Sequence, residues 1–302
     1  MSPIRWSLLV GSALTLDGAW LRANPLPQPD EQADKNARGR VVVVGGCLTV
    51  PGGVRLTAEA ALRAGAGKVQ VATIEAAAVA IGAFLPEIAV WPLKANAVGE
   101  IDAGLAELDS HLAKCDALVL GPAMGCADQA SLLVAAVMGH DVEGGLVLDA
   151  AALMTLGTHA EALRRRASPA VLTPHIGEIA ALLDRAASEI ESDREVAVVE
   201  CAQRFGAVVV LKGSVSYVAA PDGTVFAYSG GNVGLATGGS GDVMAGIAGA
   251  LIARGTPPLT AALWSVWLHG EAGRRCAEAI GPLGFLASEL LSFIPQVMDR
   301  AG

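Results

Sequence analysis

Residues 41–73 read VVVVGGCLTVPGGVRLTAEAALRAGAGKVQVAT, in which two apolar runs flank a helical segment. The runs at 41–44 and 68–73 are rich in valine, which favours strands, and residues 54–64 have the length and period of a helix. Further apolar runs of this kind occupy 117–121, 145–150, 170–174 and 207–213. Continuous apolar strands that alternate with helices predict an α/β fold, with a parallel sheet covered by helices on both faces.

The stretch 216–230, SYVAAPDGTVFAYSG, departs from this pattern. Two strand-like runs flank Asp222-Gly223, a dipeptide typical of a tight hairpin turn. We therefore expect the parallel sheet to gain an antiparallel hairpin at its edge. After Gly239 the chain is expected to be helical to its end, with breaks near 257–258 and 281–282.

Length and composition indicate one large domain and argue against nucleic acid as a partner. The chain has 302 residues, 53% of them hydrophobic and 17% charged, which suits one large domain. Residues 24–39 are rich in proline and polar side chains, so we expect a lead-in arm over 1–39 and one domain over 40–302. The net charge of −9 argues against a general nucleic-acid binder.

The expected location is the cytoplasm. The longest uncharged apolar runs reach about half of the ~20 residues that a membrane span needs, so no membrane association is predicted. The run at 6–16 faintly resembles a short signal peptide, but no convincing cleavage site follows it. The five cysteines are scattered without a C-x-x-C pair, which is typical of reduced, buried thiols.

Glycine, proline or polar residues follow five of the predicted strands. Parallel strands bind ligands beyond their carboxyl ends. Any one such residue fits an ordinary turn between a strand and a helix, but five at one edge predict a site there. They are Gly45-Gly46, the 121–125 loop GPAMG, Asp149, His175 with Glu178, and Lys212-Gly213.

The stretch 229–255, SGGNVGLATGGSGDVMAGIAGALIARG, is the most unusual in the chain. Seven glycines fall between residues 230 and 246, and an apolar run of helical character follows them. Gly238, Gly239 and Gly241 allow backbone N–H groups to turn toward one point, and a helix start adds unpaired N–H groups. The stretch therefore predicts an anion cradle suited to phosphate, although it matches neither the Walker A nor the Rossmann motif.

Asp242 has two interpretations. Aspartate is a good N-cap residue, worth ~1 kcal/mol, but residue 245 is Ala, so no capping box forms. A carboxylate beside a phosphate cradle would repel its ligand unless it had a task there. The hypothesis we favour is a general base that takes a proton from a hydroxyl attacking the phosphate. The helix start is expected to keep Asp242 ionised.

Three other polar residues each have two possible interpretations. Lys212 is either a solvated strand-end lysine or a cation close to a nucleotide. His175 is either a ligand contact or an ordinary turn histidine. Glu178, three residues later, either complements the dipole of a helix or holds a water molecule on Mg²⁺, which prefers carboxylate and water oxygens.

The stretch GNVGLATGGSGDVMAG resembles the G-x-G-D signature of the ribokinase-like superfamily and, more closely, that of the ADP/ATP-dependent NAD(P)H-hydrate dehydratases. The His-x-x-Glu spacing of LTPHIGEIAALL resembles the dehydratases, whereas sugar kinases typically have Asn-x-x-Glu there. Supporting stretches in the expected order lie at 35–46, 51–73, 146–153 and 172–183. The resemblance implies a ribokinase-like fold.

The resemblance also implies a reaction and its site. Asp242 would be the catalytic base that activates the C6 hydroxyl of the (S)-epimer of NAD(P)H hydrate, so that ADP or ATP, with Mg²⁺, phosphorylates it and phosphate leaves. The implied products with ADP are NAD(P)H, AMP and phosphate. The implied substrate-binding residues are Gly53, Gly125, His175 and Asp242. The implied nucleotide-binding residues are Lys212, Gly213, Ser214, Val215, Ser216 and Gly241, with Gly238 and Gly239 in the cradle.

Several features set this chain apart within the family it resembles. Gly53 stands where Ala is usual, Ala151 where an Asp is usual, and Ser240 where Met is common. The arm before Lys35 is too short for the epimerase domain fused to many members, so a separate epimerase is the expected functional partner. ADP is favoured over ATP, and the resemblance implies a homo-oligomer, a tetramer.

Two other functions compete with the dehydratase hypothesis. A ribokinase-like kinase of a small vitamin precursor would share the cradle, but His175 in place of Asn argues against it. A non-enzymatic nucleotide sensor would also share it, but the presence of both Asp242 and Lys212 argues against that alternative.

Overall fold

A single sheet organises the molecule. The computed structural model describes residues 12–30, 32–102, 108–139 and 143–301, so most of the run at 6–16 lies outside the described residues. Within them the sheet has ten strands in the order β1-β10-β9-β8-β7-β6-β5-β2-β3-β4. The strands are β1 (Leu14–Thr15), β2 (Arg40–Val44), β3 (Lys68–Ile74), β4 (Ala89–Leu93), β5 (Ala117–Leu120), β6 (Gly145–Leu148), β7 (Val171–Leu172), β8 (Val208–Leu211), β9 (Ser216–Ala219) and β10 (Val225–Tyr228).

The sheet is mostly parallel, which confirms the predicted fold class. The strands from β8 through β7, β6, β5 and β2 to β3 and β4 pair in parallel. The predicted hairpin is also confirmed, because β9 pairs antiparallel with both β8 and β10. One further strand from the arm, β1, pairs in parallel with the outer side of β10.

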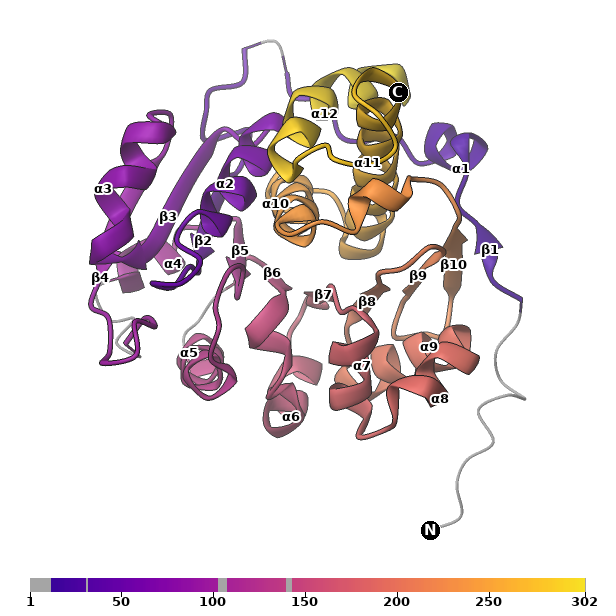
Figure 1. Ribbon diagram of the computed structural model, residues 1–302, viewed down its shortest axis with the longest axis horizontal. Helices are drawn as coiled ribbons and strands as arrows, with labels where there is room; N and C mark the ends of the chain where they lie inside the picture. Colours follow the sequence, from indigo (N-terminus) through magenta and orange to yellow (C-terminus); the bar gives the residue numbers. More distant parts are fainter. Residues whose placement is uncertain (1–11, 31, 103–107, 140–142, 302) are drawn as a thin grey trace.

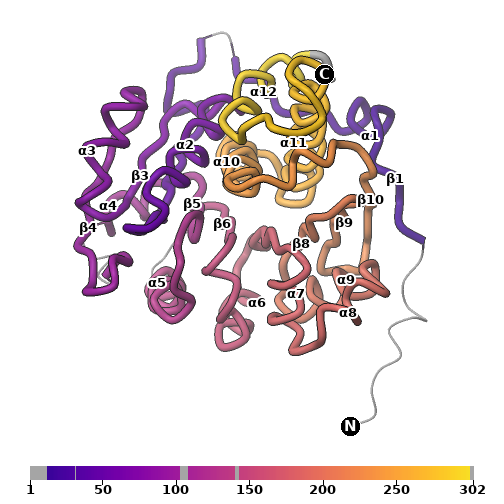
Figure 2. The backbone as a smooth tube through the Cα atoms, viewed as in Figure 1, coloured from indigo at the N-terminus to yellow at the C-terminus, as the bar shows by residue number. Residues whose placement is uncertain are grey.

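Helices cover both faces of this sheet, as Figures 1 and 2 show. One face carries α2 (Gly53–Arg63), α10 (Ser240–Ala253), α11 (Pro258–Ala279) and α12 (Ala287–Ala301). The other carries α5 (Ala127–Gly139), α6 (Ala160–Arg164), α7 (Ile176–Leu183), α8 (Ala187–Ser192) and α9 (Arg194–Phe205). The remaining helices are α1 (Gly18–Ala23), α3 (Glu75–Phe84) and α4 (Asp109–Leu112), with 3₁₀ turns η3 (Ala150–Leu153), η4 (Leu156–His159) and η5 (Val233–Leu235).

The central strands and α10 form the core. Val41 to Val44 of β2 are at most 1% exposed, and all four residues of β5 are fully buried. A strand covered on both faces needs apolar side chains at every position, so these runs do not alternate with polar residues. Helix α10 is also almost entirely buried and packs on α2, β5 and β6. Its small residues allow that close approach, since a Cβ at Gly246 would collide with the carbonyl of Thr57.

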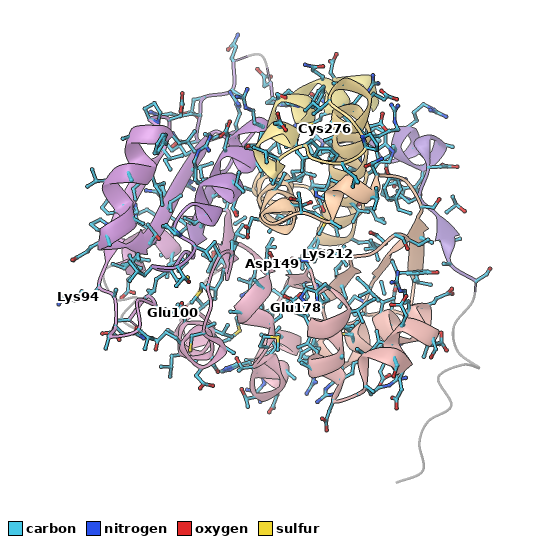
Figure 3. The ribbon with its side chains drawn as sticks, viewed as in Figure 1. Lys94, Glu100, Asp149, Glu178, Lys212 and Cys276 are labelled. Carbon is cyan, nitrogen blue, oxygen red and sulfur yellow. The ribbon has the colours of Figure 1, made fainter. Side chains whose placement is uncertain are left out.

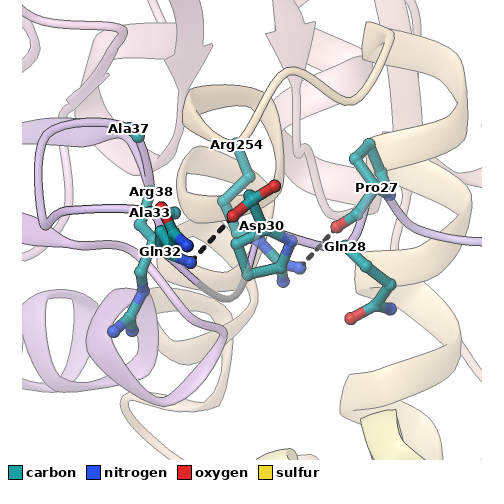
Figure 4. A pocket seen from close by; sticks show the side chains of 9 residues that line it. Pro27, Gln28, Asp30, Gln32, Ala33, Ala37, Arg38 and Arg254 are labelled. Atoms are coloured by element: carbon teal, nitrogen blue, oxygen red, sulfur yellow. Dashed lines mark hydrogen bonds between the residues drawn. The ribbon is translucent and has the colours of Figure 1, made fainter.

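The described part of the arm packs against the domain. Leu16, Leu21 and Leu26 are buried in the core cluster, and Trp264 Nε1 of α11 donates to the carbonyl of Asn24 at 2.8 Å. Arg254, at the end of α10, donates to the carbonyl of Pro27 at 2.8 Å. The arm and Arg254 line a cavity of about 410 Å³ (Figure 4).

The strand order brings the predicted strand ends together. The five strands β8, β7, β6, β5 and β2 are consecutive neighbours in the sheet. Because they are parallel, the residues that follow them lie along one edge. The convergence of the five strand ends, which the sequence predicted, is therefore confirmed.

Candidate active site

An ion pair between two strand ends lies at the centre of the site. Lys212 Nζ, which follows β8, lies 3.0 Å from Asp149 Oδ1, which follows β6. Thr173, which follows β7, donates its hydroxyl to the same oxygen at 2.7 Å. Figure 3 shows Asp149, Lys212 and Glu178 close together beside the ends of β6, β7 and β8.

The charge balance keeps Lys212 protonated. Burial lowers the pKa of Lys212, but the carboxylates of Asp149, Glu178 and Asp242 outweigh burial, and the pKa is raised overall. One ammonium group thus faces three acids. The cation is available to an anionic ligand, as the sequence-based alternative of a nucleotide contact requires.

His175 and Glu178 form a capping box at the start of α7. His175 Nδ1 accepts from the N–H groups of Gly177 and Glu178, at 3.0 and 3.3 Å, and Glu178 Oε2 accepts from the N–H of His175 at 2.8 Å. Since Nδ1 accepts, neutral His175 carries its proton on Nε2. The side chain is 60% exposed, so this N–H can donate to a bound molecule.

Glu178 also belongs to the charged cluster. Burial raises the pKa of Glu178, while Lys212 and the hydrogen bond from His175 lower it. Its second oxygen, Oε1, lies 3.5 Å from His175 Nε2. Glu178 therefore caps the helix, and it also places a carboxylate oxygen beside Lys212.

Helix α10 begins at Ser240, two residues before Asp242. Its N-cap is Gly239, with φ of +87°, and the carbonyl of Gly239 accepts from the N–H of Val243 at 3.2 Å. The left-handed turn at Gly239 is favourable only for glycine and starts the helix there. Asp242 is thus the third residue of the helix, and the interpretation of Asp242 as its N-cap is wrong.

Asp242 does not stay ionised as firmly as the helix start suggested. Burial, the largest cause, and the carboxylate of Asp149 together raise the pKa of Asp242 to about 7. Lys212 and a hydrogen bond from the N–H of Ala123 lower it. A pKa near neutrality suits a group that must both take and return a proton.

Close packing explains three of the predicted glycines. A Cβ at Gly241 would lie 3.2 Å from Lys212 Nζ, and one at Gly53 would lie 3.0 Å from Asp242 Oδ2. A Cβ at Gly125 would lie 2.9 Å from Glu100 Oε1, which accepts from the N–H of Gly125 at 3.0 Å. Gly238 is exposed, and a Cβ there would meet open space.

The predicted nucleotide loop follows Lys212. Residues 213–215 connect β8 to β9, and Ser216 begins β9, where its hydroxyl donates to the carbonyl of Gly213 at 3.4 Å. Arg194 of α9 lies along this loop and donates to the carbonyl of Val215 at 3.4 Å. A Cβ at Gly213 would collide with the Arg194 guanidinium, so the glycine admits this arginine.

Sequence reasoning missed four contributors to the site. Asp149 was singled out as a strand end but was given no role, although an acid that ends a buried strand was a usable signal. Ala123 lies in the predicted 121–125 loop but was likewise given no role, whereas Arg194 and His269 gave no signal, because they meet the site only through packing of distant segments. His269 of α11 is partly buried, and its Nε2 lies 2.7 Å from the hydroxyl of Ser240.

The residues present fit a water-held magnesium ion rather than a fully protein-held one. Among the described residues, no group of three or more His, Cys, Asp or Glu side chains could hold a metal. The hydrogen bonds from His175, Thr173 and Lys212 use Glu178 Oε2 and Asp149 Oδ1, which leaves Glu178 Oε1 and Asp149 Oδ2 as the second oxygens of the two carboxylates. Mg²⁺ usually keeps several waters and takes one or two carboxylates plus phosphate oxygens, which this pair suits.

Neither of the two best-defined cavities contains a predicted site residue. One is the arm cavity in Figure 4, and the other, of about 460 Å³, lies between α5, the turn at 154–158, α7 and Arg204. The charged side chains of the site lie instead at the strand ends.

In the described ranges no helix is long and apolar enough to cross a membrane.

The parallel strand ends and the glycine turn before α10 define a ribokinase-like α/β protein. A family model described as NAD(P)H-hydrate dehydratase matches residues 41–296, and the chain belongs to this family. It is 44% identical over 289 residues to the ADP-dependent (S)-NAD(P)H-hydrate dehydratase of Xanthomonas campestris, covering 95% of this chain and 96% of that protein. It also matches a bifunctional NAD(P)H-hydrate repair enzyme of Moorella thermoacetica at 37% identity, covering 94% of this chain but 53% of that enzyme.

Solved structures agree with this assignment. The Bacillus subtilis ADP/ATP-dependent NAD(P)H-hydrate dehydratase, co-crystallised with ATP and Mg²⁺, superposes with a TM-score of 0.81 at 26% identity. The alignment covers 96% of this chain and 99% of that structure. The family that the sequence motifs indicated is thus confirmed, and the dehydratase interpretation is better supported than the kinase alternative.

Proposed function

We propose that the protein dehydrates the (S)-epimer of NAD(P)H hydrate to NAD(P)H and converts ADP to AMP and phosphate. One observation carries the proposal beyond the names of its relatives. Asp242, with a pKa raised to about 7, lies in the first turn of α10 beside Lys212. A base of that pKa at a phosphate-binding helix start fits transfer of a phosphoryl group to a hydroxyl.

Each proposed step uses a group of this chain. Asp242 takes the proton of the C6 hydroxyl while that oxygen attacks the β-phosphorus of ADP, and the bond to the AMP oxygen breaks. The ring nitrogen lone pair then expels phosphate as the C6–O bond breaks, and the resulting iminium ion loses a proton from C5 to solvent, which restores the dihydronicotinamide. Lys212 and the first N–H groups of α10 face the transferred charge. His175 Nε2–H donates to the substrate, with Gly53 and Gly125 leaving room for it.

The nucleotide and the metal have separate places in this proposal. The loop from Lys212 through Gly213, Ser214 and Val215 to Ser216 borders the nucleotide, and the turn at Gly238-Gly239 with Gly241 cradles its phosphates. Glu178 and Asp149 would hold Mg²⁺ through water, and the ion would neutralise phosphate charge. ADP is the expected nucleotide, and relatives named as ADP-dependent support it.

We further infer the cellular setting. The five cysteines are all unpaired, which suits the reducing cytoplasm. The chain spans about half the length of the bifunctional repair enzymes that it matches, and we propose a functional partner in repair. That partner would be an epimerase that supplies the (S)-epimer. A homo-oligomer, a tetramer, stays our expectation.

The direct test supplies hydrated NADH or NADPH, Mg²⁺ and ADP or ATP, and follows the return of the absorbance of reduced nicotinamide. Recovery with ADP in excess of that with ATP, together with release of AMP and phosphate, supports the proposal. No recovery with either nucleotide from folded protein rejects it. Stable phosphorylation of a vitamin precursor instead would establish the kinase alternative.

A further inference from the structure

Ala123 has an unusual backbone conformation beside Asp242. Its φ is +56°, in the left-handed region that side chains other than glycine rarely adopt. It lies in the 121–125 loop after β5, between Pro122 and Met124, and its backbone N–H lowers the pKa of the Asp242 carboxyl. Backbone strain of this kind persists where the surroundings fix it, often at functional sites.

The methyl group of Ala123 occupies the space that a side chain at position 53 would need. A Cβ at Gly53 would lie 2.5 Å from the Ala123 Cβ and 3.0 Å from Asp242 Oδ2. Neither neighbour can yield easily, since the Ala123 methyl is fixed to its backbone and the carboxylate is held by the N–H of the same residue. A methyl at position 53 would therefore displace Ala123, Asp242 or both.

We propose that Ala123 is a positioning residue for Asp242 and that it can hold this carboxylate only because residue 53 is glycine. The proposal rests on the proposed function in so far as Asp242 is the base. Gly53 begins α2 and Ala123 follows β5, so the pair joins two elements that α10 also contacts. The presence of Gly53 where the resemblance led us to expect Ala is thereby explained.

The electrostatics of the base make the proposal measurable. Asp242 faces Asp149 from the end of β6, Lys212 from the end of β8 and the Ala123 N–H from the loop after β5. Of these, Lys212 and the N–H favour the charged carboxylate, and Asp149 opposes it. Withdrawal of the N–H alone would raise the pKa of Asp242 and leave both side chains in place.

The experiment is a double-mutant cycle of Gly53→Ala and Ala123→Gly. Gly53→Ala should lower kcat/KM at pH 7 by about fivefold for the first unit by which the pKa of Asp242 rises above 7, since the ionised fraction at pH 7 falls from about one half to about one tenth. Its activity should partly return at pH 9. Ala123→Gly keeps the N–H and removes the methyl that collides with a Cβ at position 53, so the double variant should be more active than Gly53→Ala and its pH profile should shift back toward that of wild type.

Gly52→Ala is the matched control, because a Cβ at Gly52 meets nothing within 4 Å. It should behave as wild type. Full activity of Gly53→Ala, an equal loss at every pH, or no recovery in the double variant would each overturn the proposal.

A second readout separates this proposal from the role of Asp242 as base. The ¹³C signal of the Asp242 carboxyl, assigned by its absence in Asp242→Asn, can be titrated in each variant without turnover. An upward shift in Gly53→Ala that the double variant reverses supports the positioning pair even if Asp242→Asn retains activity. An unchanged titration contradicts the pair even if Asp242→Asn is inactive.

Discussion

At the scale of the residue, Asp242 combines a functional role with a cost to stability. Its carboxylate is charged in the unfolded chain above pH 3.8, but burial holds its pKa at about 7 in the folded protein. Its removal takes away no helix cap, since Gly239 occupies that position. Asp242 is thus a residue for which activity and stability should respond in opposite directions.

Asp242→Asn should lower kcat by about 10²–10⁴, the usual contribution of a general base. The variant should be more stable than wild type at pH 8, by an amount on the order of a few kcal/mol, because it no longer buries a charge there. Steady-state kinetics and urea unfolding at pH 8 measure the two effects. A destabilised variant would show that the carboxylate serves the fold after all.

Two variants of His175 can separate its role as a helix cap from its role in binding substrate. Its Nδ1 caps α7, and its exposed Nε2–H, 3.5 Å from Glu178 Oε1, can donate to a bound molecule. His175→Asn keeps a good N-cap, but its shorter amide places no donor at the position of Nε2, so we expect an unchanged melting temperature and a raised KM for the hydrate. His175→Ala should lose both, with a destabilisation of ~1 kcal/mol. Equal KM values for wild type and His175→Asn would remove the histidine from the substrate site.

At the scale of the element, the ion pair of Lys212 and Asp149 links β8 to β6 across β7. Lys212→Met would leave a buried, unpaired carboxylate, which typically costs about 3–5 kcal/mol. The pair Lys212→Met with Asp149→Leu should regain much of that stability. Neither variant should bind ADP, as calorimetry can test. Wild-type affinity in the double variant would place the nucleotide elsewhere.

The elements were predictable where one segment alone decides its structure. The valine-rich β2, the Asp222-Gly223 hairpin and the helices after Gly239 follow from local pattern. By contrast, β4 contains Pro92 at an edge of the sheet, and the two residues of β1 gain strand geometry only from β10. Asp149 was visible as a strand end, but its bond to Lys212 depends on a sheet order that sequence alone does not show. The same holds for Ala123 and Gly53, which are 70 residues apart.

At the scale of the whole molecule, Asp242 and His269 affect the pH dependence of stability in opposite directions. The folded state holds a proton on Asp242 up to about pH 7, whereas the unfolded chain releases it near 3.8, so this group makes stability fall as pH rises across that window. Burial lowers the pKa of His269 from 6.5 to about 4, so the unfolded chain takes up a proton first on acidification. This second group makes stability rise with pH between about 4 and 6.5.

We therefore compare Asp242→Asn and His269→Gln with wild type. The difference in the free energy of unfolding between variant and wild type should change with pH in opposite directions for the two variants. The stability of Asp242→Asn minus that of wild type should grow from pH 4 to pH 7. His269→Gln can still hydrogen-bond to Ser240. Its free energy of unfolding minus that of wild type should increase by a few kcal/mol when the pH falls from 6.5 to 4. Urea unfolding at four pH values measures both differences, in which the contributions of all other titrating groups cancel. Slopes of the same sign would mean that one of the two groups is not held in its uncharged form by the fold.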